Sequence, residues 1–381
     1  MQPSQFSPSL SGNRFAVEYQ FAGNEAEARR NAELVCIDQT VEAPAELISE
    51  GFIRDQILGR IEHFQPSRPS GYEAVISFPV ELLNGHCSQL LNVAFGITSL
   101  KRGIRLTHLH LPDIALHGWT GPRFGRTGVR DLVGIQNRPL VCGVLKPLGL
   151  PIEALADLAY QFALGGLDLI KDDQGLVDQP FCPFHDRVAR CAEAVARAGR
   201  DTGRPCLYMP HVTGRWQTMH ERGRFARGVG AGGLLISPGL TGFDALQDIA
   251  QDSSIGLPIL SHPALLGSYM TNPESGIDPA VLFGQLPRLA GTDAVLYPTY
   301  GSDYAMSLDD CRRIAQATEE PWGPLKPTFP TAAGRMNLQR VPEMREFYGK
   351  DVIFILGSSI QRQKEGLVNA CRRFIEQVEA S

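Results

Sequence analysis

The sequence lacks the features that mark membrane, secreted and nucleic-acid-binding proteins. No apolar run approaches the roughly 20 residues needed to cross a bilayer. Residues 1–13 are polar and rich in Ser and Pro, without the apolar stretch of a signal peptide. A net charge of −5 supplies no basic field for a phosphate backbone. We therefore expect a cytoplasmic protein that binds neither membrane nor nucleic acid, with residues 1–13 forming a flexible arm.

Ordered cysteine spacing is also missing. The eight cysteines form no CxxC pair and no repeated short interval, and Cys142 and Cys206 lie inside apolar, strand-like runs. Because disulfides are rare in the cytosol, reduced thiols in the core are the main interpretation. A zinc site or a disulfide framework is the alternative.

The sequence does contain two regions that differ in their pattern of expected strands and helices. With 381 residues, 43% of them hydrophobic, the chain is long enough for two domains. Residues 14–135 read as an α+β module. Its expected strands are 14–21, 72–83 and 103–111, its expected helix is 24–37, and 90–100 is an apolar segment. Such a pattern favours one small sheet covered by helices.

From residue 136 onward, short apolar runs alternate regularly with helix-like segments. The expected strands are 140–146, 167–173, 205–212, 233–238, 258–262, 294–299, 326–333 and 351–357. The expected helices are 152–164, 186–198, 219–229, 243–250, 280–289, 308–317, 338–347 and 367–378. Continuous apolar strands such as 351–356 are typical of parallel strands buried on both faces.

Eight β and eight α units match the size of a TIM barrel. We therefore predict an α/β protein in which residues 136–381 form a C-terminal TIM (β/α)8 barrel, preceded by an N-terminal α+β domain at 14–135. An open doubly wound sheet is the alternative, although no GxGxxG follows the first strand of the barrel region.

The sharpest local motif is Lys171-Asp172-Asp173, at the end of the second expected barrel strand. TIM-barrel active sites lie at the carboxyl ends of the strands. Alternation along the strand points Lys171 and Asp173 to one side and Asp172 to the other. One carboxylate beside a cation is a poor magnesium site. The pair becomes a good one if CO2 carbamylates Lys171, whereas a strand-end salt bridge is the plain alternative.

Small residues after the last two strands predict a phosphate cradle. Gly357, Ser358 and Ser359 leave backbone N–H groups and hydroxyls available to an anion, and Ala332 and Gly334 supply the facing side. An ordinary Gly/Ser turn is the alternative.

Other strand ends carry groups suited to acid–base chemistry or to substrate binding. His262 ends the fifth strand as a candidate acid, base or hydroxyl donor, and His211 ends the third with a weaker claim. Lys146 ends the first strand as a candidate base or oxyanion binder. Thr299 ends the sixth strand and is a candidate substrate contact.

These motifs together resemble one family. Residues 165–173, read as GGLDLIKDD, resemble the GGxDxxKDDE signature of ribulose-bisphosphate carboxylase and its relatives. Lys146-Pro147 followed by 148–150 resembles that family's strand-one KPKLGL. Segments 261–264 and 298–302 resemble strands five and six of RuBisCO-like proteins. The resemblance covers nearly the whole chain and implies a ferredoxin-like N-terminal domain.

The resemblance also implies roles for single residues. Lys171 is the lysine that is carbamylated by CO2, and Mg2+ is held by Lys171 and Asp173. Lys146 is the base or the lysine that handles the enolate, and His262 contacts the sugar phosphate or its hydroxyls. Residues 357–359 hold a phosphate. The family also implies a homodimer in which the partner subunit closes the site of a phosphorylated small-molecule substrate.

Departures from the family pattern exclude the best-known activity. Gln174 replaces the Glu of KDDE and could still offer a carbonyl oxygen to the metal. Loop 299–304 has no lysine to hold incoming CO2, and the strand-seven serine corresponds to Ala332. Without the loop cation the carboxylation transition state loses a large stabilising contribution. CO2 fixation is therefore not expected.

What remains is enolate chemistry, which a divalent cation supports on a ketone and its neighbouring oxygen. The pattern over residues 171–181 is most similar to acid-sugar relatives from apiose catabolism. The leading hypothesis is decarboxylation, or transcarboxylation with hydrolysis, of a substrate like 3-oxo-isoapionate-4-phosphate. A tautomerase of the 2,3-diketo-5-methylthiopentyl-1-phosphate enolase type and a sugar-phosphate isomerase are alternatives. If Gln174 has abolished metal binding, the chain is a non-catalytic sugar-phosphate-binding protein.

Overall fold

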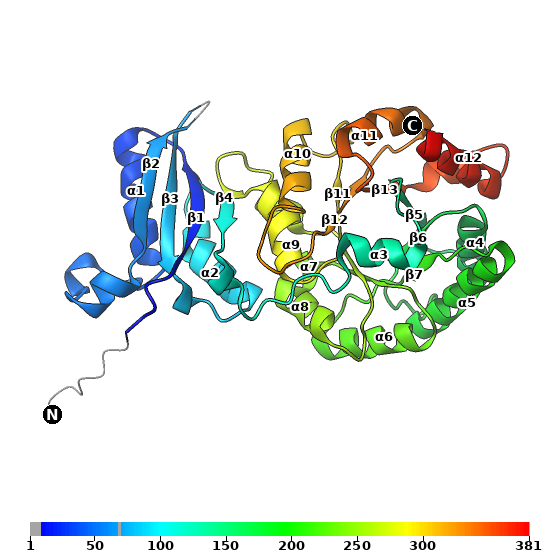
Figure 1. Ribbon diagram of the computed structural model, residues 1–381, viewed down its shortest axis with the longest axis horizontal. Helices are drawn as coiled ribbons and strands as arrows, with labels where there is room; N and C mark the ends of the chain where they lie inside the picture. Colours follow the sequence, from blue (N-terminus) through cyan, green and yellow to red (C-terminus); the bar gives the residue numbers. More distant parts are fainter. Residues whose placement is uncertain (1–8, 68–69, 381) are drawn as a thin grey trace. The chain divides into compact units, whose positions relative to one another are not determined.

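The chain forms two compact units in the computed structural model, which describes residues 9–67 and 70–380 (Figure 1). The first unit comprises the described part of Met1–Trp119 together with Gly267–Leu282 and Pro321–Pro324. The second comprises Thr120–Leu266, Phe283–Glu320 and the described part of Leu325–Ser381. Of the expected N-terminal arm, residues 1–8 lie outside the described part. The backbone N–H groups of Leu10 and Ser11 donate to Gln56 and Glu81 of the first unit.

The first unit is built on a five-stranded sheet in the order β10-β4-β1-β3-β2. Its strands are β1 (Arg14–Phe21), β2 (Arg60–Pro66), β3 (Tyr72–Pro79), β4 (Ile104–His110) and β10 (Gly276–Ile277). Strand β1 buries alternate side chains and pairs antiparallel with both β3 and β4. Its helices are α1 (Glu25–Asp38) and α2 (Cys87–Phe95). The expected α+β module is confirmed.

Helix α1 begins where its capping residues require. Asn24 accepts a hydrogen bond from the Glu27 N–H, and the Glu27 carboxylate accepts one from Asn24. This capping box satisfies two backbone donors that a helix start would otherwise leave unpaired.

Two strands of this sheet were not predicted from the sequence. Strand β2 is polar and mostly exposed, and β10 is a two-residue strand contributed by Gly267–Leu282, far along the chain.

The second unit is a ring of eight parallel strands in the order β7-β6-β5-β13-β12-β11-β9-β8. The strands are β5 (Leu140–Leu145), β6 (Leu169–Asp172), β7 (Leu207–Met209), β8 (Leu234–Ile236), β9 (Ile259–Ser261), β11 (Ala294–Pro298), β12 (Phe329–Ala333) and β13 (Ile353–Leu356). The Leu235 N–H donates to the Pro210 carbonyl at 2.9 Å, and the Val212 N–H donates to the Leu235 carbonyl at 3.0 Å. These bonds join the two end strands, so the predicted TIM barrel is confirmed over the open sheet.

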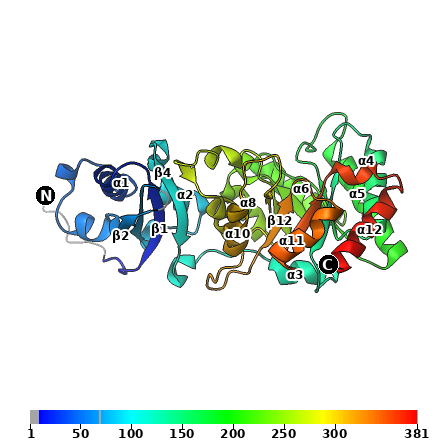
Figure 2. The ribbon, with the colours of Figure 1, turned by 90° about the horizontal axis from the view of Figure 1, so that it is seen from above.

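Helices surround the barrel strands (Figures 1 and 2). They are α3 (Gly125–Val133), α4 (Ile152–Leu164), α5 (Phe184–Thr202), α6 (Trp216–Gly228), α7 (Pro238–Thr241), α8 (Phe243–Gln251), α9 (Leu286–Leu289), α10 (Leu308–Ala317), α11 (Val341–Tyr348) and α12 (Leu367–Ala380). The helix expected over 280–289 is a π-helical turn at Val281–Gln285 followed by the short α9. In the described part of the chain, no helix has the length and apolar character to cross a membrane.

Candidate active site at the rim of the barrel

Strand alternation decides which rim side chains face the barrel axis. One apolar cluster fills the barrel interior. Its strand members are Leu140, Cys142, Val144, Leu169, Leu207, Met209, Leu235, Leu260, Ala294, Leu296, Phe329, Ile353 and Ile355. Continuing each strand by steps of two residues brings polar groups to the inner rim: Lys146, Lys171, Asp173, His211, Ser237 and His262. The same alternation turns Asp172, Thr299 and Ala332 outward, toward the helices.

Lys171 is the most deeply buried cation of the inner rim. It is 2% exposed, and its ammonium donates to the Asp172 backbone carbonyl at 2.9 Å. Burial lowers the pKa of Lys171 to about 8, and the nearby Lys146 cation adds to this effect, whereas Asp173 opposes it. The lysine therefore has an appreciable neutral fraction close to neutral pH, which is the form that reacts with CO2.

Asp173 lies between Lys171 and the end of β5. Its Oδ1 is 3.6 Å from the Lys146 Nζ and accepts a hydrogen bond from the Gln174 N–H at 2.8 Å. The Gln174 residue is exposed. The structure thus brings Lys146, Lys171 and Asp173 together; alternation along β6 predicted this for Lys171 and Asp173.

These residues fit a magnesium ion on the condition that Lys171 carries a carbamate. Within residues 9–67 and 70–380, no three His, Cys, Asp or Glu side chains gather as a metal site. An unmodified Lys171 offers no oxygen donor, but a carbamate on its buried amine would offer two. With the Asp173 carboxylate and the Gln174 amide, it would make the all-oxygen donor set that Mg2+ prefers.

The two rim histidines are neutral. His211 is 1% exposed, and its Nε2 lies 3.2 Å from the Ser237 Oγ. Burial lowers the pKa of His211 to about 3 and that of His262 to about 2, with the Lys171 cation adding to both shifts. The His262 Nδ1 accepts a hydrogen bond from the Ala264 N–H at 3.2 Å. At neutral pH both rings can orient hydroxyls or accept protons, and neither is an imidazolium acid.

Ser237 is a rim residue to which sequence reasoning assigned no role. It is fully buried, and besides its contact with His211 its N–H donates to the Thr213 Oγ1 at 2.9 Å. Its position in the sequence could have identified it. Ser237 lies two residues after the interior Leu235, so strand alternation points its side chain toward the inner rim.

Two predicted substrate contacts have side chains that face elsewhere. The Thr299 side chain is fully buried, and its Oγ1 lies 3.5 Å from the Tyr348 hydroxyl on α11. Ala332 is also fully buried, whereas its neighbour Ala333 packs against the interior cluster. The inward position at the end of β12 therefore belongs to Ala333.

The predicted phosphate cradle lies at the ends of β12 and β13. Gly357 follows β13, and the exposed Ser358 begins a short 3-10 turn; the side chain of Ser359 lies outside the described residues. Gly334 follows β12 with φ of +105°, and a Cβ there would lie 2.7 Å from the Ser302 Cβ. Both the backbone conformation and the close approach require glycine at this position.

Replacing Gly334 by alanine is therefore expected to displace the loop after β11 and to weaken phosphate binding. We expect the Kd for inorganic phosphate to rise about tenfold, because the added Cβ meets Ser302 while φ stays unfavourable. Isothermal titration would measure the change, with Gly349→Ala, which meets no atom within 4 Å, as a matched positive-φ control. Equal affinities in wild type and Gly334→Ala would remove this glycine from the cradle.

The loop after β11 is tied down by two arginines that sequence reasoning missed. The Arg340 Nη2 donates to the Tyr300 carbonyl at 3.0 Å, and Arg335 forms an ion pair with Asp303. Both arginines come from the segment after β12. The loop that lacks the CO2-holding lysine is thus anchored to the neighbouring strand's loop.

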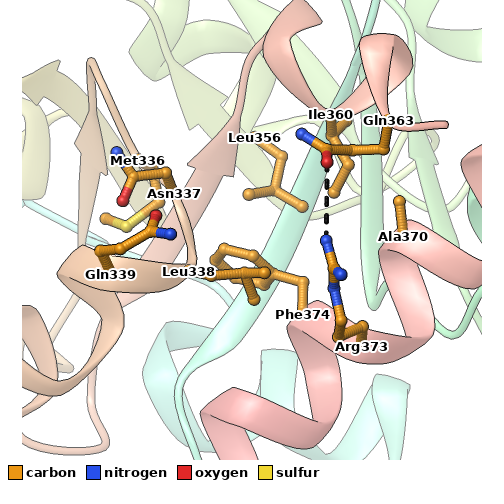
Figure 3. Close-up of a pocket in the computed structure, with 10 residues that line it drawn as sticks. All are labelled: Met336, Asn337, Leu338, Gln339, Leu356, Ile360, Gln363, Ala370, Arg373 and Phe374. Atoms are coloured by element: carbon orange, nitrogen blue, oxygen red, sulfur yellow. Dashed lines mark hydrogen bonds between the residues drawn. The ribbon is translucent and has the colours of Figure 1, made fainter.

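A cavity of about 130 Å3 lies outside this rim (Figure 3). Leu338, Leu356, Ile360 and Phe374 form its apolar wall, and Arg373 donates to Gln363 at its edge. None of the predicted site residues lines it. Because Ile355 faces the barrel interior, alternation places Leu356 on the outer side of β13, so this cavity is separate from the inner rim.

Comparison with known proteins places the chain in a family. The sequence model for the ribulose bisphosphate carboxylase large chain, catalytic domain, matches residues 127–371. With the barrel and its lysine-bearing rim, this match shows that the chain belongs to the RuBisCO large-chain family. Its relatives include RuBisCO-like proteins. The RuBisCO-like protein 1 of Rhodopseudomonas palustris is 37% identical, covering 96% of this chain and 97% of the relative.

Other relatives carry names of specific activities. The 5-methylthioribulose-1-phosphate isomerase of Rhodospirillum rubrum is 35% identical over 96% of each chain. The 2,3-diketo-5-methylthiopentyl-1-phosphate enolase of Geobacillus kaustophilus is 32% identical, covering 80% of this chain and 74% of the relative. Among solved structures, a RuBisCO-like protein from R. palustris superimposes with a TM-score of 0.87 at 36% identity, covering 96% of this chain and 97% of that one.

Proposed function

We propose that the barrel rim performs magnesium-assisted enolate chemistry on a phosphorylated keto-sugar acid. The leading reaction is decarboxylation, or transcarboxylation with hydrolysis, of a substrate like 3-oxo-isoapionate-4-phosphate. The observation that carries the proposal is the buried Lys171, with its lowered pKa, beside Asp173 at a rim whose β11 loop has no lysine.

Each inner-rim group has a role in this proposal. Mg2+ held by the Lys171 carbamate, Asp173 and the Gln174 amide would stabilise the developing negative charge on the substrate oxygens. Lys146, beside Asp173, delivers a proton to the enolate carbon after CO2 has left. His262 orients a substrate hydroxyl as a neutral ring, and so does His211 with its partner Ser237.

The phosphate of the substrate is assigned to the cradle. Gly334, Gly357, Ser358 and Ser359 would offer backbone N–H groups and hydroxyls to its oxygens. Thr299 and Ala332 take no side-chain role, because their side chains face the helices. CO2 fixation has no place in the proposal, since loop 299–304 holds no cation for the carboxylated transition state.

A second candidate is proton transfer on a methylthio sugar phosphate, as a tautomerase or isomerase. The names of the R. rubrum and G. kaustophilus relatives favour it. The same rim groups would form the same kind of enolate by removing a proton instead of losing CO2. The two candidate reactions differ in one product, CO2, so an assay of CO2 release distinguishes them.

Measuring that product tests the proposal. The protein would be incubated with Mg2+, bicarbonate and a phosphorylated 3-oxo aldonic acid of the isoapionate type, and released CO2 would be quantified. Magnesium-dependent release supports decarboxylation, and loss of substrate without CO2 supports transcarboxylation or hydrolysis. Intact acid together with turnover of a 2,3-diketo or ribulose methylthio phosphate would favour the second candidate. No turnover of either, with binding retained, would leave a sugar-phosphate-binding protein.

Carbamylation of Lys171 is expected to depend on pH. Because burial lowers the pKa of Lys171 to about 8, the reactive neutral amine becomes more abundant as pH rises through that value. At fixed dissolved CO2, the initial rate of carbamate formation should increase roughly 25-fold between pH 6.5 and 8.5. Labelled 13CO2 and NMR of the carbamate carbon would follow it, with Lys171→Met as the blank. A rate independent of pH, or an equal signal in the blank, would contradict the assignment.

We also propose a homodimer in which the partner's N-terminal unit closes the rim. The octameric RuBisCO of Pyrococcus horikoshii superimposes with a TM-score of 0.91 at 26% identity, covering 96% of this chain and 88% of that one, and supports assembly of the fold into larger particles. Light scattering of the purified protein would give its mass in solution.

A further inference from the structure

The two proposed metal-binding side chains Asp173 and Gln174 lie on a loop, not on a strand. Strand β6 ends at Asp172, and helix α5 begins at Phe184. The intervening residues 173–183 include only an isolated bridge between Gln179 and Cys182. Loops are the more mobile parts of a fold. Something must therefore hold this one if it is to present ligands in a constant geometry.

A fully buried arginine of α5 reaches into that loop. Arg187 is 0% exposed. Its Nη2 donates to the Val177 carbonyl at 2.9 Å, and its Nη1 donates to the Cys182 carbonyl at 3.1 Å. One guanidinium therefore grips the loop at two points, five residues apart. The planar fork presents its donors in a fixed geometry, whereas a lysine ammonium is one compact charge on a flexible stem.

Asp172 anchors the same arginine from the other side. Its carboxylate is 0% exposed, and its Oδ2 lies 3.2 Å from the Arg187 Nε. It also accepts hydrogen bonds from the Tyr208 hydroxyl at 2.8 Å and from the His211 N–H at 3.0 Å. The outward-facing member of the Lys171-Asp172-Asp173 motif thus joins β6, β7 and α5, and it fixes the backbone at His211.

A second arginine supports the loop from α6. The Arg222 Nη2 lies 3.0 Å from the Asp178 Oδ2, and its Nη1 donates to the Thr213 carbonyl at 3.0 Å. The Phe184 ring lies near both guanidinium groups, 5.1 Å from that of Arg222 and 5.5 Å from that of Arg187. The loop is therefore held to two helices by charge-assisted contacts, which are more deeply buried at Arg187 than at Asp178.

We propose that Arg187 is a positioning residue: anchored by Asp172, it holds loop 173–183, which carries Asp173 and Gln174, in one place beside the end of β6. Its consequence for metal binding rests on the proposed function, whereas its hold on the loop does not. A buried ion pair with every polar atom satisfied restricts the chain to one arrangement. Groups that orient metal ligands in this way typically matter to metal affinity.

Arg187→Lys is the decisive variant, because it keeps a cation facing Asp172 and removes the fork. The matched control is Arg138→Lys. Arg138 pairs with Asp168, just before the start of β6 and far from the rim. It is 6% exposed, and it makes two contacts of 2.7 and 2.9 Å with that carboxylate. Should Arg187→Lys fail to fold, the neutral pair Asp172→Asn with Arg187→Gln replaces it, since both charges are then removed together.

The first readout is hydrogen exchange of the metal-free protein. We expect exchange in residues 173–183 to accelerate about tenfold or more in Arg187→Lys and to stay at the wild-type rate in Arg138→Lys. The second readout is the Kd for Mg2+ in the presence of bicarbonate, which should rise about tenfold in Arg187→Lys alone.

Unchanged loop exchange in Arg187→Lys would overturn the proposal, as would an equal acceleration in both variants, which would indicate general loosening. Failure of the proposed function gives a different result. Wild type would then bind no Mg2+ and turn over no substrate, while the exchange comparison, made without metal, would still decide the role of Arg187.

Discussion

Replacing Lys171 by methionine is expected to abolish magnesium-dependent turnover, lowering kcat/KM by at least about 10³-fold. The variant loses the amine that would carry the carbamate, and with it the oxygen donors that complete the metal site. Asp173 and Gln174 alone cannot supply the oxygen set that Mg2+ prefers. Assays of CO2 release and of methylthio sugar-phosphate turnover, with and without bicarbonate, would measure the loss whichever candidate reaction is correct.

The same substitution should leave the fold intact, which makes the loss interpretable. Lys171 is 2% exposed, and methionine has a similar length with no charge to bury. Thermal unfolding should therefore show a stability equal to that of wild type or slightly higher. Lys350→Met is the matched control, because Lys350 is exposed, lies outside the rim and donates to the Gln136 carbonyl. Magnesium-dependent turnover in Lys171→Met would remove Lys171 from the site.

Replacing Asp293 by alanine is expected to be the most destabilising change at the base of the barrel. This carboxylate is 1% exposed and immediately precedes β11. It accepts hydrogen bonds from the N–H groups of Phe124, Gly125 and Ile259 at 2.8, 2.7 and 2.9 Å. It thereby ties the start of α3 to β9 and β11. Alanine would leave three backbone donors unpaired, at a cost of about 3–5 kcal/mol in the free energy of unfolding.

Urea unfolding of wild type, Asp293→Ala and Asp293→Asn would test this. Asparagine keeps one acceptor oxygen but turns an NH2 group toward a backbone N–H. The free energy of unfolding should therefore decrease less in Asp293→Asn than in Asp293→Ala. A free energy of unfolding for Asp293→Ala within about 1 kcal/mol of wild type would show that water or a backbone shift satisfies the three donors.

The barrel was predictable because its signal is local. Each barrel strand is a short apolar run, and each is followed by a segment with helical spacing. The strand–helix repeat could therefore be predicted from the order of these segments in the sequence. The same logic missed β2, which has little apolar content, and β10, which pairs with β4 from about 170 positions away. Lys146, Lys171, Asp173 and His262 were found because polar residues stand out after an apolar strand.

Long-range contacts account for the parts of the site that the sequence could not reveal. Arg187 occurs within an ordinary helical pattern, and nothing near it shows that its guanidinium reaches Val177, Cys182 and Asp172. Thr299 directly follows β11, and Ala332 is the next-to-last residue of β12. The direction in which each side chain points depends on where alternation starts in the closed barrel. A shift of one residue along a strand exchanges its inward-facing and outward-facing side chains.

The positions of the barrel strands and of most helices, and the chemical types at the rim, thus follow from residue pattern, because propensity and hydrophobic alternation act over neighbouring residues. Tertiary structure alone decides the rest. Closure of the barrel selects Lys146, Lys171, Asp173, His211, Ser237 and His262 for the inner rim. Burial then lowers the pKa of Lys171 and of both histidines. Desolvation arises only when distant strands pack together, so no local reading of the chain contains it.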